Sequence, residues 1–363
     1  MRESDGTATK PARILELESK AMPAITDPYL REQLEKRRDE LKALISAIPA
    51  SEPETATAPF ISLLREVDSA VRRIDDGSYG TCEVCHDAVE KERLIADPLV
   101  RLCLDHLSGA EQRALERDIE LAARIQLGLL PEPHVRFRDW RVHYYYKPAG
   151  MVSGDYCDVI SPSSGNGALT FLLGDVAGKG VAASLLMTHL HAMFRSLVSM
   201  GLDLERLLEV ANRLFCESTF AGQYATLVCG RAGGNGDIEV ASAGHFPALL
   251  ASTHGVTQIG ATGLPLGMFA TSCYTVCRAH LDPHDTLLLY TDGISEANSP
   301  SGEEFGIGGL SRAVSERHGS EPQELVARCL REVERHSSGI RQADDQTLMV
   351  IQRTGAGQAA FND

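Results

Sequence analysis

The sequence predicts an α+β protein whose largest domain is a layered α/β/β/α sandwich, preceded by an α-helical hairpin with a small finger and by a linker helix. Two observations predict this fold. Short apolar runs typical of strands alternate with two pairs of helical segments, at 180–200 and 203–218 and at 308–318 and 321–337. Nearer the N-terminus, 25–48 and 60–74 have apolar residues at helical spacing.

Composition indicates a globular protein of more than one domain. The chain has 363 residues, of which 43% are hydrophobic, and a formal net charge of −15. The acidic balance argues against general nucleic-acid binding. No apolar run approaches the roughly 18 residues that span a bilayer, and the N-terminal MRESDGTATK has no apolar signal-peptide core. We therefore expect a cytoplasmic protein with no direct nucleic-acid or membrane partner.

The composition shifts along the chain divide it into five segments. Residues 1–24 are expected to be a disordered tail and 354–363 a second tail. Residues 25–107 hold the hairpin and the finger, 108–131 the amphipathic linker helix and 132–353 the sandwich domain. A short polar turn containing prolines, PASEPETATAP, separates the two N-terminal helical stretches, which favours an antiparallel hairpin over two unrelated linker helices.

The finger is predicted from the spacing of four candidate ligands. Cys82 and Cys85 form one C-x-x-C pair, and Cys103 and His106 form a C-x-x-H pair seventeen residues later. Each pair lets one tight turn present two ligands to a tetrahedral ion, which is the pattern of zinc sites. Four protein ligands leave no open position, so we expect one structural Zn²⁺. His86 is off this spacing and is not expected to bind.

The linker segment 108–131 reads as one amphipathic helix that ends at Pro131. Its apolar stripe consists of Leu115, Ile119, Ala122, Ile125 and Leu129. A stripe of this kind favours packing against the sandwich domain or a second copy of the chain over a passive spacer. The residues alone leave both of these partners open, and the expected assembly is a homodimer.

Strands are predicted across the sandwich domain from short apolar runs bounded by turn residues. The predicted strands are 139–146, 152–160, 168–175, 224–231, 237–243, 247–251, 274–280, 286–291 and 347–352. Carboxylates stand where four of them begin or stop beside glycine or polar turns: Asp155, Asp175, Asp292 and Asp344. One such aspartate is ordinary turn chemistry, and Asp175 alone could be a helix cap. Four in one domain favour a binuclear metal site, because hard cations prefer carboxylate and carbonyl oxygens.

Six motifs in order carry a resemblance: GDYCD, GDVAGKG, ASAGHFP, GLPLG, YTDGISEA and DDQT. Across residues 120–353 the chain resembles the bacterial metal-dependent (PPM-type) serine/threonine phosphatases, in the SpoIIE/RsbU-like branch. The resemblance implies the α/β/β/α sandwich and two Mn²⁺ or Mg²⁺ ions. In that scheme Asp175 bridges both ions and Asp155 completes one, while the Val176 carbonyl, Asp292 and Asp344 serve the other. The four aspartates are the expected catalytic residues.

Two further aspartates have more than one interpretation. Asp345 is the alternative to Asp344 as a direct ligand, and Asp158 neighbours Asp155 and could lie behind it.

Four other side chains near the motifs also keep two interpretations. His245 could act as an acid or serve only as a structural histidine, and Glu296 could support Asp292 or cap a turn. Lys147 and Lys179 could meet substrate phosphate.

Residues 26–107, including IDDGSYGTCEVC, resemble the DksA/TraR family of regulators that bind RNA polymerase. His106 stands where that family usually has its last Cys, and the tip PASEPETA lacks the family's paired aspartates. We therefore interpret this segment as a module for sensing or assembly. Its expected partner is an activator protein, with RNA polymerase as the alternative.

The phosphatase resemblance implies hydrolysis of phosphoserine or phosphothreonine on a regulatory protein. The implied substrate is a STAS-domain anti-sigma-factor antagonist, and the N-terminal module would regulate the enzyme. Three rival functions are a non-catalytic phosphatase-like scaffold, a transcription regulator acting through the finger, and a different binuclear hydrolase acting on nucleotides or nucleic acid. The presence of every matching carboxylate argues against the first rival, and the missing tip motif argues against the second.

Overall fold

The computed structural model describes residues 28–47, 54–107, 109–162, 167–220, 222–315, 319–340 and 342–355. The chain separates into two compact units, Met1–Leu115 and Glu116–Asp363, which are described one at a time. The predicted tail 1–24, and all of 354–363 except its first two residues, lie outside the described residues. The boundary between the units falls inside helix α4, Gly109–Leu129.

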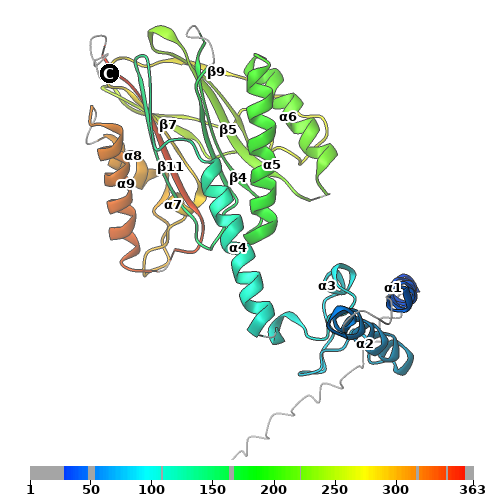
Figure 1. Cartoon of the computed structure of the whole chain (residues 1–363). Helices are drawn as coiled ribbons and strands as arrows, with labels where there is room; N and C mark the ends of the chain where they lie inside the picture. The colour runs from blue at the N-terminus through cyan, green and yellow to red at the C-terminus, as the bar shows by residue number, and fades with distance from the viewer. Residues whose placement is uncertain are drawn as a thin grey trace, which may run out of the picture. The chain divides into compact units, whose positions relative to one another are not determined.

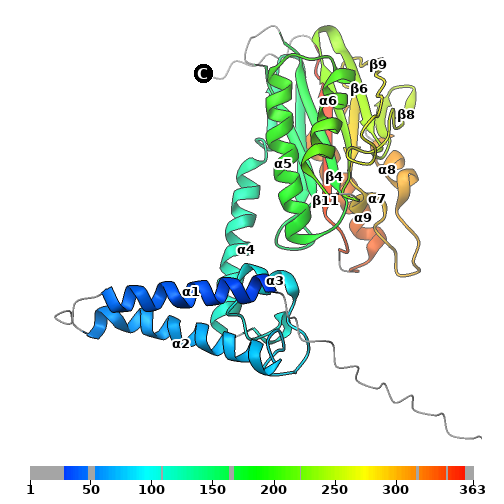
Figure 2. The ribbon, with the colours of Figure 1, turned by 90° about the vertical axis from the view of Figure 1, so that its right-hand side faces the viewer.

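The first unit contains a helical hairpin, seen along its length in Figure 2. It is formed by α1, Pro28–Ala47, and α2, Glu54–Asp76. Arg31 near the start of α1 donates to the carboxylate of Asp75 at the end of α2, with 2.6 Å between the atoms. The two helices are therefore antiparallel, as the sequence predicted.

The hairpin is held by apolar residues at helical spacing on facing sides. Leu30, Leu34 and Leu41 of α1 and Val67 and Ala70 of α2 are all buried in one cluster. Burial of each such side chain contributes on the order of 1.5–3 kcal/mol.

Helix α2 begins at Glu54, earlier than the predicted start at Phe60. The prediction treated Pro59 as a helix breaker, but Pro59 lies inside α2. Pro59 is the sixth residue of α2, so its missing N–H removes a single hydrogen bond of the helix, and the helix continues past it.

The second unit is built on two antiparallel sheets, whose neighbouring strands come from distant parts of the sequence. One sheet has the order β1 (His134–Phe137), β2 (Trp140–Lys147), β11 (Gln346–Arg353), β10 (Thr286–Tyr290), β7 (Ala248–Ser252) and β8 (Gly255–Ile259). The other has the order β3 (Asp155–Ile160), β4 (Leu169–Val176), β5 (Ala225–Ala232), β6 (Asp237–Ala243) and β9 (Cys277–His280).

Each sheet is buried on both faces, which explains the continuous apolar runs. In β10, Leu287 and Leu289 enter the core between the sheets. Leu288 and Tyr290, which point the opposite way, enter a core against helices. Because successive side chains alternate between faces, a strand covered on both sides is apolar throughout.

Helix pairs cover the outer faces, as Figures 1 and 2 show. Helices α5 (Gly180–Ser199) and α6 (Leu204–Ser218) pack on the β3–β4–β5–β6–β9 sheet. Helices α8 (Gly306–Ser315) and α9 (Pro322–Ser337) pack on the other sheet. The result is the predicted α/β/β/α sandwich.

Two edge strands were absent from the prediction, β1 and β8. Both are short and half-exposed, and each has at most one buried residue. An edge strand with little burial carries no strong apolar pattern, so periodicity does not reveal it.

Among the described residues, one helix is long and apolar enough to cross a membrane by length and composition alone, namely α5. This differs from the expectation that no segment approaches that threshold. Met187, Leu190, Phe194 and Leu197 of α5 are buried in the core that also includes Leu172 of β4. The apolar character of α5 is thus used in packing within the sandwich.

Candidate functional site

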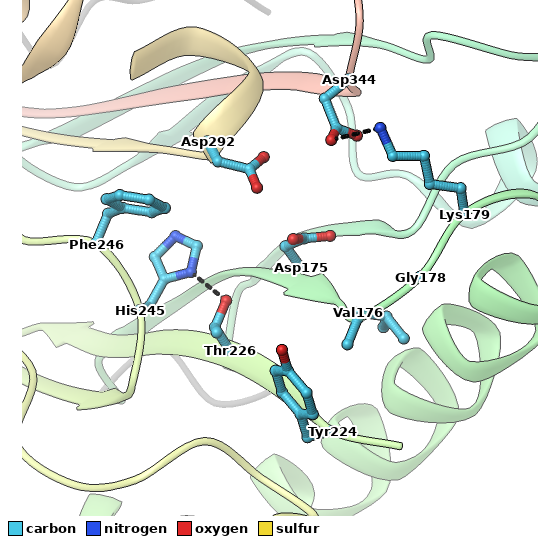
Figure 3. Close-up of a pocket in the computed structure, with 11 residues that line it drawn as sticks. Asp175, Val176, Gly178, Lys179, Tyr224, Thr226, His245, Phe246, Asp292 and Asp344 are labelled. Atoms are coloured by element: carbon cyan, nitrogen blue, oxygen red, sulfur yellow. Dashed lines mark hydrogen bonds and ion pairs between the residues drawn. The ribbon is translucent and has the colours of Figure 1, made fainter. Parts of the chain in front are cut away.

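Three aspartates from distant positions in the sequence meet in one cavity of about 300 Å³ (Figure 3). Asp175 lies near the end of β4, Asp292 begins the short helix α7 (Asp292–Ser295) after β10, and Asp344 precedes β11. Val176, Lys179, Tyr224, Thr226, His245 and Phe246 line the same cavity. The structure thereby brings together four of the five residues predicted to hold the metals.

Asp155, the fifth, lies directly opposite Asp175 in the β3–β4 register. It is 1% exposed and does not line the cavity. Its Oδ2 accepts hydrogen bonds from the hydroxyls of Thr291, at 2.9 Å, and Thr347, at 2.5 Å. Its Oδ1 is buried with no hydrogen-bond partner among the described residues. A buried oxygen without a hydrogen-bond partner costs free energy, and a bound cation would remove that cost. Oδ1 of Asp155 can therefore serve as a cation ligand.

Glycines beside two of the aspartates let the backbone close around the site. A Cβ on Gly174, before Asp175, would lie 2.5 Å from the carbonyl oxygen of Thr226. A Cβ on Gly293, after Asp292, would lie 2.0 Å from the carbonyl oxygen of Asp345. The glycines of the GDV and TDG motifs are therefore required by close backbone approach.

The carboxylates of the site are largely buried, and their negative charges repel one another. Burial, followed by the charges of Asp292 and Asp344, raises the pKa of Asp175 to about 7. Burial and the charge of Asp175 raise the pKa of Asp155 well above its ordinary value. Burial and the charge of Asp344 raise the pKa of Asp292. A divalent cation would relieve this repulsion, and an all-oxygen donor set suits Mg²⁺ or Mn²⁺, so the residues fit the predicted metals.

Lys179 is the basic residue that lines this cavity. Its Nζ lies 2.8 Å from Oδ2 of Asp344 and 3.0 Å from the carbonyl oxygen of Ala343. The Lys179 side chain is 66% exposed, so it can move from Asp344 to another anion at little cost.

Asp344 and Asp345 differ in what their side chains contact. Asp344 faces the cavity (Figure 3). Both side-chain oxygens of Asp345 accept backbone N–H groups, from Ala149 at 2.7 Å and from Gly154 at 2.9 Å. Asp345 therefore holds the loop that leads into Asp155. Asp344 accepts the N–H of Asp345 on Oδ1 and faces the exposed Lys179 with Oδ2, so its carboxylate borders the cavity and can reach an ion there.

Asp158 faces away from the cavity, toward α5. Its side chain is fully buried and accepts two hydrogen bonds from Arg195, at 2.8 and 2.7 Å. The Arg195 side chain is 44% exposed, so losing it costs less than the loss of a partner from a fully buried pair. Asp158 therefore joins β3 to α5 and is not part of the metal cluster.

His245 is a neutral, fully hydrogen-bonded side chain. Its Nε2 lies 3.1 Å from the carbonyl oxygen of Tyr290, so Nε2 carries the proton and Nδ1 accepts from the Thr226 hydroxyl at 2.8 Å. Burial lowers the pKa of His245 to about 4. These contacts favour the structural interpretation over an acid, because the only ring proton is already donated.

Sequence reasoning missed the polar side chains that support the aspartates. Gln126 of α4 is buried; its side chain donates to the carbonyl of Ser153 at 2.7 Å and accepts from the N–H of Ser153 at 3.0 Å. The Ser153 hydroxyl in turn accepts from the N–H of Asp155 at 3.1 Å. The sequence signal that could have revealed this contact is Gln126 itself, a lone glutamine on the apolar side of the helix predicted at 108–131.

The four finger residues also come together. One side-chain atom from each of Cys82, Cys85, Cys103 and His106 lies within 4.8 Å of all the others. Cys103 Sγ is 3.3 Å from His106 Nδ1 and 3.7 Å from Cys85 Sγ. His86, as expected, lies outside this cluster. Three thiols and one imidazole at this spacing match a tetrahedral zinc site.

Two family models match this chain, one in the sandwich unit and one at the finger. Residues 165–354 match the family model of stage II sporulation protein E (SpoIIE), and residues 77–105 match that of the prokaryotic dksA/traR C4-type zinc finger.

Two curated relatives and one solved structure illustrate the similarity. Protein IcfG of Synechocystis sp. is 26% identical over 267 residues, covering 65% of this chain and 41% of IcfG. Phosphoserine phosphatase RsbU of Bacillus subtilis is 27% identical over 253 residues, covering 67% of this chain and 72% of RsbU. The SiaA-PP2C domain of Pseudomonas aeruginosa aligns with a TM-score of 0.59 at 18% identity, covering 69% of this chain and all of that domain.

The chain thus spans about two fifths of the length of IcfG, while the SpoIIE model covers more than half of the chain. The sandwich has the PP2C fold of the solved domain. The chain therefore belongs to the SpoIIE family of PP2C-type phosphatases and carries a dksA/traR-type zinc finger.

Proposed function

We propose that this protein is a metal-dependent phosphatase that removes phosphate from serine or threonine of a regulatory protein. The observation that carries the proposal is the convergence of Asp175, Asp292 and Asp344 on one cavity, beside the buried, unpaired Oδ1 of Asp155. The family membership and the printed name of RsbU, a phosphoserine phosphatase, support the same reaction.

In this proposal Asp175 would bridge two Mn²⁺ or Mg²⁺ ions and Asp155 would complete one of them. The Val176 carbonyl, Asp292 and Asp344 would hold the other. When bound, the two ions would lower the pKa of water and neutralise phosphoryl oxygens during an in-line displacement.

The remaining residues of the cavity position these groups and the substrate. Neutral His245 ties Thr226, opposite Asp175 in the sheet, to the carbonyl of Tyr290 just before Asp292. Lys179 is exposed and close enough to Asp344 to exchange that carboxylate for a substrate phosphoryl oxygen. Removing either residue should weaken positioning without removing a metal ligand.

Phosphate release in Mn²⁺ tests the proposal. The full chain would be assayed on p-nitrophenyl phosphate and on a phosphorylated STAS-domain protein, with Asp175→Asn as the control. We expect Mn²⁺-dependent turnover that Asp175→Asn abolishes. No turnover on either substrate despite bound Mn²⁺ would contradict the proposal and favour the non-catalytic scaffold.

The finer proposal names the substrate as a STAS-domain anti-sigma-factor antagonist in a partner-switching pathway, acted on in the cytoplasm. It is supported by the similarity to RsbU across 67% of the chain. A panel of phosphorylated STAS proteins from one genome would test it. Hydrolysis of p-nitrophenyl phosphate with no action on any STAS protein would contradict the proposed substrate. The proposed phosphatase reaction would still stand.

The N-terminal module, on this proposal, binds one structural Zn²⁺ and controls the phosphatase as a homodimer. Its ligand cluster and its match to the dksA/traR finger support the zinc. We assign its partner as an activator protein rather than RNA polymerase. Recovery of core polymerase by the full chain in a pull-down would contradict that assignment.

A further inference from the structure

A second cavity, of about 620 Å³, adjoins the catalytic cavity within the sandwich unit. Asp344 lines both cavities, and Gly293 of the second directly follows Asp292 of the first. We name this second cavity the α9 groove. Its remaining walls come from the end of β2, the segment after α7, helix α9, residues 339–340, residues 342–344 and Gln346. Cavities of this size accommodate several side chains of a ligand.

Part of the α9 groove is lined by apolar side chains. Leu330 and Val333 of α9 contribute to this part, and their spacing places them on the same face of the helix as Glu334. Ile340, which is 47% exposed, adds to the apolar lining beyond the end of α9. This apolar part would bury an aliphatic side chain of a bound partner.

The rim of the α9 groove is acidic. Glu296 and Glu334 are exposed, and neither has an ion-pair partner among the described residues. Against them the described lining offers one basic residue, Lys147. Asp344 at the shared wall already faces Lys179 and the catalytic cavity. The rim therefore retains two carboxylates that can pair with a cationic side chain.

We propose that the α9 groove binds the residues flanking the phosphoserine or phosphothreonine of the protein substrate, and that it selects flanks with a basic and an aliphatic side chain. The proposal rests on the proposed function. A chain whose phosphoryl group is in the cavity, at the metals that Asp175, Asp292 and Asp344 would hold, can pass the shared wall at Asp344 directly into the groove. There Glu334 and Glu296 would attract Lys or Arg and repel Asp or Glu.

Short phosphoserine peptides test this directly. On an alanine background, each flanking position would carry Arg in one peptide and Glu in its match, and the full chain would be assayed in Mn²⁺. Each exposed ion pair contributes little free energy. We therefore expect kcat/KM for the Arg-flanked peptide to exceed that for its Glu-flanked match by about three- to fivefold, mainly through a lower KM. Equal kcat/KM for every Arg and Glu pair would overturn the proposal.

A charge reversal in the groove links the preference to this surface. Glu334→Lys should reverse the preference toward Glu-flanked peptides and leave p-nitrophenyl phosphate turnover unchanged, because that substrate has no flank. Glu324→Lys makes the same charge change on an exposed residue of α9 that does not line the groove, so it should keep the wild-type preference. A preference for Arg that survives Glu334→Lys would overturn the proposal.

Binding separates failure of this proposal from failure of the phosphatase assignment. Fluorescent peptides carrying a non-hydrolysable phosphonate in place of phosphoserine would be titrated into the full chain. Tighter binding of the Arg-flanked peptide, lost in Glu334→Lys, would support the groove even if no substrate were hydrolysed. Equal binding of Arg- and Glu-flanked peptides would overturn the groove even if p-nitrophenyl phosphate turnover were normal.

Discussion

The two ligand clusters of this protein differ in chemistry and in accessibility. The finger cluster has three thiols and one imidazole within 4.8 Å of one another. The carboxylate cluster offers only oxygens and opens on a cavity of about 300 Å³. Soft ligands in a closed set of four favour a structural zinc, whereas hard ligands with open positions favour ions that meet a substrate. The difference indicates that one cluster serves folding and the other serves chemistry.

The clusters also differ in how they are assembled. The finger ligands come from two short turns in one segment of the sequence. The carboxylates come from β3, β4, the start of α7 and the loop before β11, so they meet only when both sheets have formed. Damage to the finger should therefore stay local, and damage to the sandwich should affect catalysis.

The largest expected effect is that of Asp175→Asn. Asp175 is the proposed bridging ligand, so its loss should lower kcat for phosphate release in Mn²⁺ by about a thousandfold or more. Asp158→Asn is the matched control, because Asp158 lies nearby on β3 but pairs with Arg195. It should affect stability more than catalysis. Comparable loss of kcat in both variants at equal folded fraction would contradict the distinction.

The next effect is loss of zinc in Cys103→Ser. Substituting a residue that hydrogen-bonds to a metal ligand lowers the metal affinity about 10–100-fold. Loss of a direct ligand should therefore lower the zinc affinity more than a hundredfold. Metal analysis of the purified chain would show zinc falling from about one ion to none. Any remaining phosphatase activity should still depend on Mn²⁺. Full zinc retention in this variant would show that the cluster is not the zinc site.

A smaller effect is expected in the stability of the Mn²⁺-free protein. The pKa of Asp175 is about 7 in the folded state, above its ordinary 3.8. The folded state therefore holds more protons between these values, and stability should fall as pH rises from about 4 through 7, by about 1–3 kcal/mol.

Denaturant unfolding at pH 5 and pH 8 checks this, after dialysis to remove Mn²⁺. Asp175→Asn should reduce the pH dependence, since the amide does not titrate, and the raised pKa values of Asp155 and Asp292 account for the part that remains. Added Mn²⁺ should stabilise the wild type at pH 8, by about 2.7 kcal/mol at a hundred times Kd. A Mn²⁺-free wild type that becomes more stable from pH 5 to pH 8 would contradict the account.

The smallest effect on metal binding and catalysis is expected for Gln126→Leu. It leaves the buried N–H and C=O of Ser153 without their partners, at a cost of about 1–3 kcal/mol for each group. Because Ser153 also holds the N–H of Asp155, the affinity for Mn²⁺ should fall several-fold. Unchanged stability and Mn²⁺ affinity in Gln126→Leu would show that this contact is dispensable.

Much of the fold could be predicted from the sequence because both sheets are buried on two faces. Apolar runs such as Thr286–Tyr290 therefore stand out, whereas the half-exposed edge strand Gly255–Ile259 carries no such pattern. The finger ligands follow from spacing alone.

The carboxylate site was only partly accessible to sequence reasoning. Adjacent Asp344 and Asp345 are identical in type, and the two backbone N–H groups that occupy Asp345 come from residues more than 190 positions away. The supports of Asp155, the hydroxyls of Thr291 and Thr347, lie 136 and 192 positions away in the sequence. Such contacts depend on register between strands, which no local pattern encodes.

The most direct test of the central claim is a joint measurement of metal content and activity. Full-length protein would be titrated with Mn²⁺ while bound manganese, bound zinc and phosphate release from p-nitrophenyl phosphate are followed in the same samples. We predict that activity rises as about two Mn²⁺ bind, with zinc constant, and that Asp175→Asn keeps zinc but shows neither Mn²⁺ binding nor activity. Activity that follows zinc, or is full without Mn²⁺, would contradict the account.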